Sequence, residues 1–124
     1  MIDNTSDIVG FWVLRSWDIV DRKGTCAPYP VDELSGFLHY GSKTMAVSIY
    51  DKKSSKVLTT YGGPYEFDGM KVRHKPYDGC SPLGGVKEKV RHIEIRDKEM
   101  MMETDWLDHD FDTKYRLRWQ RQRE

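Results

Sequence analysis

The residue best suited to chemistry is His74, which lies in an alternating segment, Met70–Tyr77. Basic side chains such as Lys71 and Arg73 share one face of this extended chain, so the imidazole lies on the opposite face with Val72. Burial among apolar groups lowers the pKa of an imidazole and keeps it neutral. A neutral histidine can take a proton from a carbon acid or a hydroxyl and return it elsewhere. We predict that His74 is a catalytic acid/base; the alternative is a core histidine hydrogen-bonded to a tyrosine or a carbonyl.

Arg91 is the second candidate, because alternation places it inside the protein if Ile93 faces inward. A buried guanidinium needs a carboxylate or a ligand oxygen, and it could stabilise an enolate or another oxyanion. The alternative is an outward Arg91 that pairs with Glu88 or Glu94, while a bulge turns His92 inward.

Tyrosine hydroxyls complete the predicted site, since they can donate hydrogen bonds to an oxygenated ligand. Their ordinary pKa is too high for a base. Tyr65 is predicted to be catalytic, and Asp18 could hold one tautomer of His74. In the alternative interpretation the tyrosines and methionines only fill the core. The predicted ligand-binding residues are Leu14, Ser16, Tyr40, Tyr61, Met100, Met102, Trp106 and Tyr115.

The sequence contains no motif typical of a metal-binding or cofactor-binding site. His39, His74, His92 and His109 lie on separate segments without paired ligand spacing, which argues against a zinc site. The acidic segment Asp108–Asp112 lacks the glycine and the distal glutamate of a calcium loop. Phosphate-loop, dinucleotide and Gly-x-Ser-x-Gly motifs are also missing. We therefore expect no metal and no cofactor.

Short alternating segments separated by turn residues must position these side chains. A three-residue loop at 41–43 and an Asp97–Lys98 turn join neighbouring strands, and Asp68–Gly69 predicts a type I′ hairpin turn. An antiparallel meander of this kind usually closes into a barrel, because closure removes exposed edges. We predict a single all-β domain over residues 1–124, an eight-stranded antiparallel up-and-down barrel. The predicted strands are Val9–Val20, Gly36–Tyr40, Thr44–Tyr50, Lys56–Phe67 with a bulge or bend at Gly62–Gly63, Met70–Tyr77, Val86–Arg96, Glu99–Trp106 and Thr113–Gln122.

Alternation also assigns the tryptophans of the first strand to opposite faces. Trp12 is predicted to plug one end of the barrel, with Leu14 and Ser16 following it along the interior. Trp17 is then predicted to pack outside, under a loop or a terminal segment. Met100 and Met102 would form a pliable apolar wall.

The composition of the sequence argues against some classes of binding partner. Lys and Arg equal Asp and Glu in number, so no overall field attracts nucleic acid or an anionic membrane. The first residues lack the pattern of a signal peptide, and no stretch predicts a transmembrane helix. We expect a cytoplasmic protein in which Cys26 and Cys80 are free thiols. The expected partner is a small hydrophobic ligand or substrate, with neither nucleic acid nor membrane; the oligomeric state stays open, a homodimer included.

The order of several short motifs resembles the bacterial and fungal lipocalin-like domain family, a branch of the calycin barrels. The matched positions are Gly10, Trp12, Leu14 and Ser16; Tyr29–Pro30; Gly36, Leu38 and Tyr40; Met45–Ser48; Tyr61, Gly63, Tyr65 and Glu66; Val72 and His74; Arg91; and Leu117, Trp119 and Arg121. After the loop proline the family often has an aromatic residue, where this chain has Leu83.

The resemblance implies a small-molecule pocket, and some members look like cyclases or isomerases of specialised metabolism. Together with His74, Arg91 and the tyrosines, it predicts a cofactor-independent cyclase, isomerase or lyase. Such an enzyme would act on an apolar, oxygenated, natural-product-type substrate by proton transfer and confinement. The alternatives are a carrier for a hydrophobic metabolite and an interaction module with a filled interior.

Overall fold

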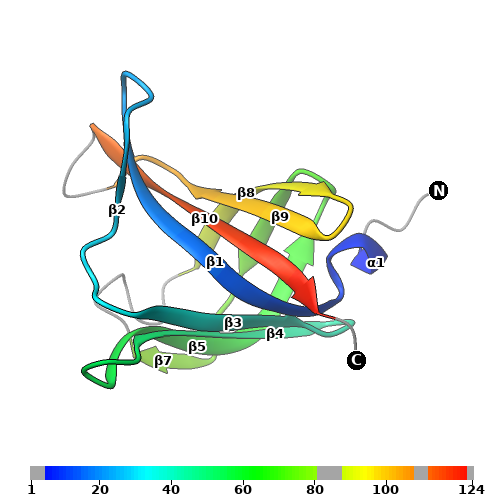
Figure 1. The fold of residues 1–124 in the computed structure, drawn as a ribbon. Helices are drawn as coiled ribbons and strands as arrows, with labels where there is room; N and C mark the ends of the chain where they lie inside the picture. Colours follow the sequence, from blue (N-terminus) through cyan, green and yellow to red (C-terminus); the bar gives the residue numbers. More distant parts are fainter. Residues whose placement is uncertain (1–4, 81–87, 108–111, 123–124) are drawn as a thin grey trace.

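The computed structural model describes residues 5–80, 88–107 and 112–122, and about 70% of them lie in strands (Figure 1). Val86, the loop that contains Leu83, and most of the acidic segment 108–112 lie outside the described residues. The elements are α1 (Thr5–Ile8), β1 (Gly10–Asp21), β2 (Cys26–Pro28), β3 (Leu34–Tyr40), β4 (Thr44–Asp51), β5 (Lys56–Phe67), β6 (Lys71–His74), β7 (Asp78–Cys80), β8 (Lys89–Arg96), β9 (Glu99–Thr104) and β10 (Thr113–Gln122).

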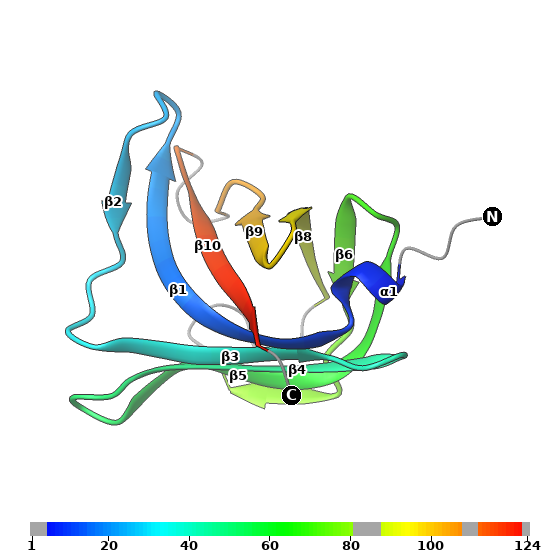
Figure 2. The ribbon, with the colours of Figure 1, turned by 45° about the vertical axis from the view of Figure 1, so that its right-hand side comes forward.

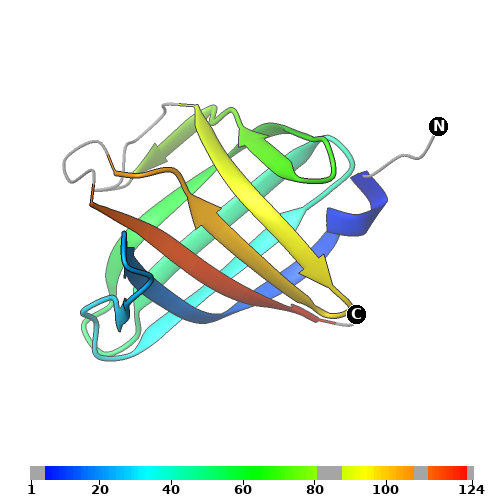
Figure 3. The same cartoon turned by 90° about the horizontal axis from the view of Figure 1, so that it is seen from above.

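The strands form a closed antiparallel ring. Their order is β1-β3-β4-β5-β6-β8-β9-β10, and β10 pairs with β1 to complete the circle. β2 pairs with the second half of β1, where Figure 2 shows it alongside that strand. Seen from above, β8, β9 and β10 cross over β3, β4 and β5, so the two groups enclose the interior (Figure 3). The predicted eight-stranded antiparallel barrel is confirmed.

The ring is irregular where β6 and β7 follow each other along β5, in addition to register shifts in the β1–β10 and β4–β5 pairings. Pairing shifts by one residue between Tyr65↔His74 and Gly62↔Asp78, so the bulge lies in the chain at 75–77. From the sequence we predicted a bulge or bend at Gly62–Gly63, but β5 runs as one strand through these glycines. Gly63 faces this bulge, and a Cβ there would lie 2.4 Å from the carbonyl oxygen of residue 75. The glycine therefore permits a close backbone approach.

The hairpin turn between β5 and β6 differs from the predicted one by a residue. Phe67 pairs with Val72, so the two-residue loop is Gly69–Met70, not Asp68–Gly69. Only the glycine has a positive φ, +97°, as in a type II′ turn. Asp68 precedes the loop, and its carboxylate accepts hydrogen bonds from the backbone N–H groups of the two residues that end the turn.

A bulge in β1 overturns the predicted faces of Ser16 and Trp17. Leu14 pairs with Trp119, but Ser16 pairs with the exposed Arg118, so the register shifts at Arg15. Alternation changes phase at a bulge. Trp17 therefore points inward, where it is 2% exposed, and Ser16 lies on the opposite face of the strand, paired with Arg118.

The core is aromatic at both ends of β1. Trp12 is fully buried, as predicted, and its indole N–H donates to the Ile8 carbonyl in α1, 3.0 Å away. The guanidinium of Arg121 lies 4.3 Å from the Trp12 ring centre and donates to the Val9 carbonyl. These contacts hold α1 against the barrel. No helix in the described part of the chain is long and apolar enough to cross a membrane.

Candidate functional site: a Tyr–His–Tyr chain in the barrel

His74 ends β6 with its side chain inside the barrel, 1% exposed. Its Nδ1 lies 2.7 Å from the Tyr61 hydroxyl oxygen, and its Nε2 lies 2.5 Å from the Tyr40 hydroxyl oxygen. Tyr61 comes from β5 and Tyr40 from the end of β3, so three strands supply the group. We call these three side chains the Tyr–His–Tyr chain.

The number of donors and acceptors in the Tyr–His–Tyr chain shows which atom carries each proton. A neutral imidazole has one N–H and one lone pair, so one tyrosine donates to it and the other accepts from it. Tyr40 is fully buried, and within the described residues its hydroxyl bonds only to Nε2 of His74. Tyr40 is therefore assigned as the donor, and Nδ1–H donates to the Tyr61 oxygen. The remaining hydroxyl proton of Tyr61 is free for another acceptor.

Burial keeps all three groups neutral. It lowers the pKa of His74 well below its ordinary value, and the nearby positive charges of Arg91 and Lys89 lower it further. Burial also raises the pKa of Tyr61 to about 12, against a smaller opposing effect of Arg91. The pKa of Tyr40 is raised well above its ordinary value, again mainly by burial. Neither a phenolate nor an imidazolium is favoured here.

Arg91 faces inward, which is one of the two orientations that the sequence left open. In the pairing of β8 with its two neighbours it lies opposite Val72 and Thr104, both buried. His92 points to the other side, and its Nε2 lies 2.7 Å from an Asp105 carboxylate oxygen. The β8 strand thus keeps strict alternation between these two residues.

The two glutamates that could have paired with Arg91 have other partners. Glu88 pairs with Arg73 at 3.2 Å, and Glu94 pairs with Arg96. The guanidinium of Arg91 donates to the Val90 carbonyl at 3.0 Å. Within the described residues, no carboxylate forms an ion pair with it.

Lys89 is a buried cation that sequence reasoning missed. It lies two residues before Arg91 on the same face of β8, opposite His74, and is 5% exposed. Its Nζ lies 5.1 Å from the centre of the Tyr61 ring. The alternation that placed Arg91 inside the barrel also predicts an inward side chain two residues earlier, at Lys89.

A cavity of about 40 Å³ lies beside the Tyr–His–Tyr chain. A buried water needs roughly 10–15 Å³ on this measure, so the cavity has room for about three waters. A larger ligand requires the surrounding side chains to move. The cavity is lined by Trp17, Leu38, Val47, Ile49, Thr59, Tyr61, His74, Arg91, Met102, Thr104, Tyr115, Leu117 and Trp119.

The structure brings part of the predicted site together. His74, Arg91, Tyr61, Met102 and Tyr115 all line the cavity. Tyr40 is not among the lining residues, and it contacts the site through His74.

Five predicted site residues lie elsewhere. The Tyr65 hydroxyl donates to the Gly41 carbonyl, while Leu14 and Met100 are buried outside the cavity lining. Ser16 is displaced by the bulge in β1. Trp106 lies beyond the end of β9 and is not among the residues that line the cavity; its ring contacts the cations of Arg22 and Lys114.

Asp18 also lies away from His74. It pairs with Arg116 across β1 and β10, on the outer side of the barrel, because the bulge changes its face as well. The partners that orient the imidazole are the two tyrosines instead. A tyrosine was among the alternatives that the sequence left open for His74.

Two tryptophans in the cavity wall were not predicted as site residues. Trp17 and Trp119 are 2% and 1% exposed, and their indole N–H groups have no hydrogen-bond partner in the described part of the chain. Tyr29, which precedes β3, stacks on Trp17 with ring centres 3.9 Å apart and covers that end of the wall. Alternation alone could not identify Trp17, because the bulge precedes it.

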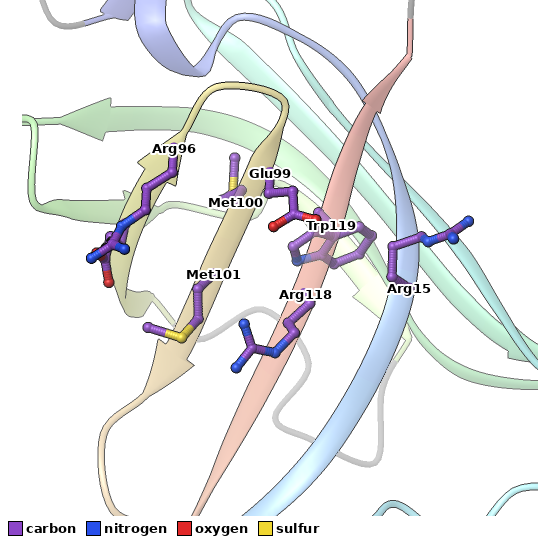
Figure 4. A pocket seen from close by; sticks show the side chains of 8 residues that line it. Arg15, Arg96, Glu99, Met100, Met101, Arg118 and Trp119 are labelled. Carbon is purple, nitrogen blue, oxygen red and sulfur yellow. Dashed lines mark hydrogen bonds and ion pairs between the residues drawn. The ribbon is translucent and has the colours of Figure 1, made fainter.

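A larger hollow of about 380 Å³ lies on the outer side of β8, β9 and β10 (Figure 4). It is lined by charges of both signs, three arginines and two glutamates, together with Met100, Met101 and Trp119. Figure 4 shows the side chains of Arg15 and Arg118 directed away from each other. Because these charged groups face water and do not converge, this hollow lacks the positioned chemistry of the interior cavity.

Comparison of the chain with protein-family models, with curated proteins and with solved structures finds no match in any of the three. The class of the protein therefore follows from its own geometry. It is an antiparallel β-barrel that could bind small molecules, with a polar chain of two tyrosines and a histidine at its interior cavity.

Proposed function

We propose that the protein binds a small, mainly apolar, oxygenated molecule inside the barrel and catalyses a proton shift on it without a cofactor. The observation that carries the proposal is the Tyr–His–Tyr chain, which ends on a cavity wall at the hydroxyl of Tyr61. The order of motifs that resembles the lipocalin-like domain family agrees with such a pocket. The reaction class is that of an isomerase or of a cyclase that begins by enolisation.

The neutral state of the chain determines which proton transfer fits. A step that left a phenolate and an imidazolium would oppose both pKa shifts. A step that gives one proton and receives another leaves no ion. Tyr61 donates its hydroxyl proton to a ligand carbonyl oxygen and receives a proton from the adjacent ligand carbon. The C–H electron pair becomes the new C=C bond, and the C=O π pair forms the new O–H bond.

The other residues have positioning and electrostatic roles in this step. His74 holds the Tyr61 oxygen through Nδ1–H, and Tyr40 holds His74 in that tautomer. Arg91 stabilises negative charge that develops on the ligand oxygen. Met102 and the aliphatic wall can adapt to the ligand, since thioether side chains are flexible.

The test follows deuterium incorporation into enolisable ketones in D₂O by NMR, with acetone, butanone and cyclopentanone as probes. Wild-type protein should accelerate exchange at the carbons beside the carbonyl. Tyr61→Phe should lower the rate by roughly 10²-fold, as expected for loss of a general acid. Tyr77→Phe, a hydroxyl deletion at a 75% exposed tyrosine, should leave the rate unchanged. Absence of exchange with all three ketones, or equal rates for wild type and Tyr61→Phe, would refute the proposal.

The carrier function is the alternative that shares this cavity. It predicts that ketones bind, with shifts of the Trp17 and Trp119 indole signals, but that no deuterium enters them. The same samples therefore separate an enzyme from a carrier.

A further inference from the structure

Two of the residues that line the cavity carry N–H donors without an acceptor among the described residues. The indole N–H groups of Trp17 and Trp119 are buried and have no partner in the described residues. The Tyr61 hydroxyl proton is not needed by His74. A buried donor without an acceptor costs roughly 1–3 kcal/mol, so donors of this kind indicate a ligand that accepts hydrogen bonds.

The register places these donors on neighbouring strands. Trp119 pairs with Leu14, and Trp17 pairs with Leu117, so both indoles project from the seam between β1 and β10. Arg91 projects from β8 and Tyr61 from β5, and both line the same cavity. A molecule in the cavity is therefore enclosed by donor-bearing residues from four strands.

Among the described residues that line the cavity, charge has one sign. Arg91 faces inward from β8 and lines the cavity, whereas none of these lining residues is an aspartate or a glutamate. The nearest glutamates in sequence are bound on the outer surface to Arg73 and Arg96. An anionic ligand would balance this charge, and a cationic ligand would be repelled.

We infer that the ligand carries a carboxylate, which binds in the cavity between Arg91, Tyr61 and the two indoles. A carboxylate has two oxygens and about four acceptor sites, matching several convergent donors. Its few atoms suit a cavity with room for about three waters. The apolar remainder of the ligand would then contact Met102 and the aliphatic residues of β3 and β4. This inference rests on the proposed function only in that a ligand occupies the barrel.

The first experiment compares butyrate, butyramide, butan-1-ol and butylamine on the wild-type protein at constant ionic strength. The readout is the indole N–H region of ¹H–¹⁵N NMR spectra during titration. Butyrate should bind at least tenfold more tightly than the other three compounds, and should shift the Trp17 and Trp119 signals. The Trp12 signal is the internal control, because its N–H already donates to Ile8.

A matched pair of variants identifies the cation that recognises the carboxylate. Arg91→Met should remove the preference for butyrate over butan-1-ol, whereas Arg73→Met, on the outer face of β6, should keep it. Trp119→Phe, which deletes one donor and retains an aromatic ring, should weaken butyrate binding with less effect on butan-1-ol. Equal affinity of the wild type for butyrate and butan-1-ol overturns the inference, as does an unchanged preference in Arg91→Met. The wild-type comparison decides the question even if Arg91→Met does not fold.

The outcomes separate this inference from the proposed reaction. Butyrate binding without deuterium exchange into ketones retains the carboxylate site and removes the catalytic proposal. Deuterium exchange into ketones without selective butyrate binding retains the catalytic proposal and removes the carboxylate site.

Discussion

Histidine and arginine side chains have different kinds of partner on the inner and the outer face of the barrel. On the outer face, His92 bonds to Asp105, and Arg116 and Lys114 both pair with Glu103. On the inner face, His74 bonds only to tyrosines, and Arg91 has no carboxylate partner in the described residues. The outer-face charges named here have partners of opposite sign, whereas the described residues at the cavity include an arginine without a carboxylate partner and two indole donors without acceptors.

This contrast separates stability from function. Ion pairs on a solvated surface contribute little energy and need no ligand. Buried polar groups without complements reduce stability unless a ligand supplies the missing partner. Without a ligand, the buried polar groups of the interior therefore lower the stability of the folded protein.

The largest expected effect comes from removing the two histidines separately. His74→Leu leaves two buried phenols without their shared partner and should lower the free energy of unfolding by roughly 2–5 kcal/mol. His92→Leu breaks an exposed contact and should change stability by less than about 1 kcal/mol. Urea unfolding of both variants measures the difference. Similar losses in the two would contradict the asymmetry between the faces.

The two arginines should give effects of opposite sign. Arg91→Met removes a partly buried, inward-facing cation that has no carboxylate partner in the described residues, and should raise stability by up to about 1–2 kcal/mol in the absence of ligand. Arg116→Met leaves Glu103 with Lys114 alone and should lower stability by up to about 1 kcal/mol. Thermal and urea unfolding of the ligand-free proteins test this. A stability loss in Arg91→Met would mean that the guanidinium is satisfied without a ligand.

The lowered pKa of His74 predicts a pH dependence of stability. The unfolded chain binds a proton at this histidine near pH 6.5, but the folded protein does not, so stability is lost as pH falls below 6.5. The slope for one group approaches about 1.4 kcal/mol per pH unit until the folded pKa is reached. The difference in unfolding free energy between wild type and His74→Leu, measured from pH 7.5 to 5.5, should shrink on acidification by about 1 kcal/mol. A constant difference would show that His74 titrates alike in both states.

Carboxylates of the outer face contribute at lower pH and do not interfere with this window. Hydrogen bonds from Arg116 and Lys114 lower the pKa of Glu103 despite its partial burial. Its stabilising contribution is therefore present above the ordinary carboxyl range and is lost only as pH falls below about 4.5.

The smallest expected effect concerns Trp106. Its ring contacts Arg22 and Lys114 at centroid distances of 3.9 and 4.9 Å. Cation–π contacts at exposed sites contribute about 0.5–1 kcal/mol each, so Trp106→Leu should lower stability by about 1 kcal/mol. Butyrate binding should be unchanged in this variant. Altered binding would extend the ligand site beyond the cavity lining.

Sequence reasoning was most successful where alternation runs without interruption. The predicted last strand, Thr113–Gln122, has the observed bounds, and its inward Tyr115, Leu117 and Trp119 are all buried. The inward positions of His74 and Arg91 follow in the same way, since their strands contain no register shift between the diagnostic residues. Lys89 could have been found by extending that pattern by two residues.

Prediction failed where one extra residue changes the phase of a strand. The bulge at Arg15 exchanges the faces of Ser16 and Trp17, and no residue type in that stretch marks it. The hairpin turn moved by one residue because Asp68 bonds to the turn backbone with its side chain and leaves the positive φ to Gly69 alone.

The sequence by itself determined the strands, the closed barrel and the inward face of each regular strand, because these depend on local alternation and short turns. Only the tertiary structure decided that Tyr40 and Tyr61 meet at His74, that two indoles find no acceptor among the described residues, and that Glu88 and Glu94 pair outside the barrel. Those facts depend on contacts between strands distant in sequence, and on bulges that cost little energy locally but rotate every side chain that follows.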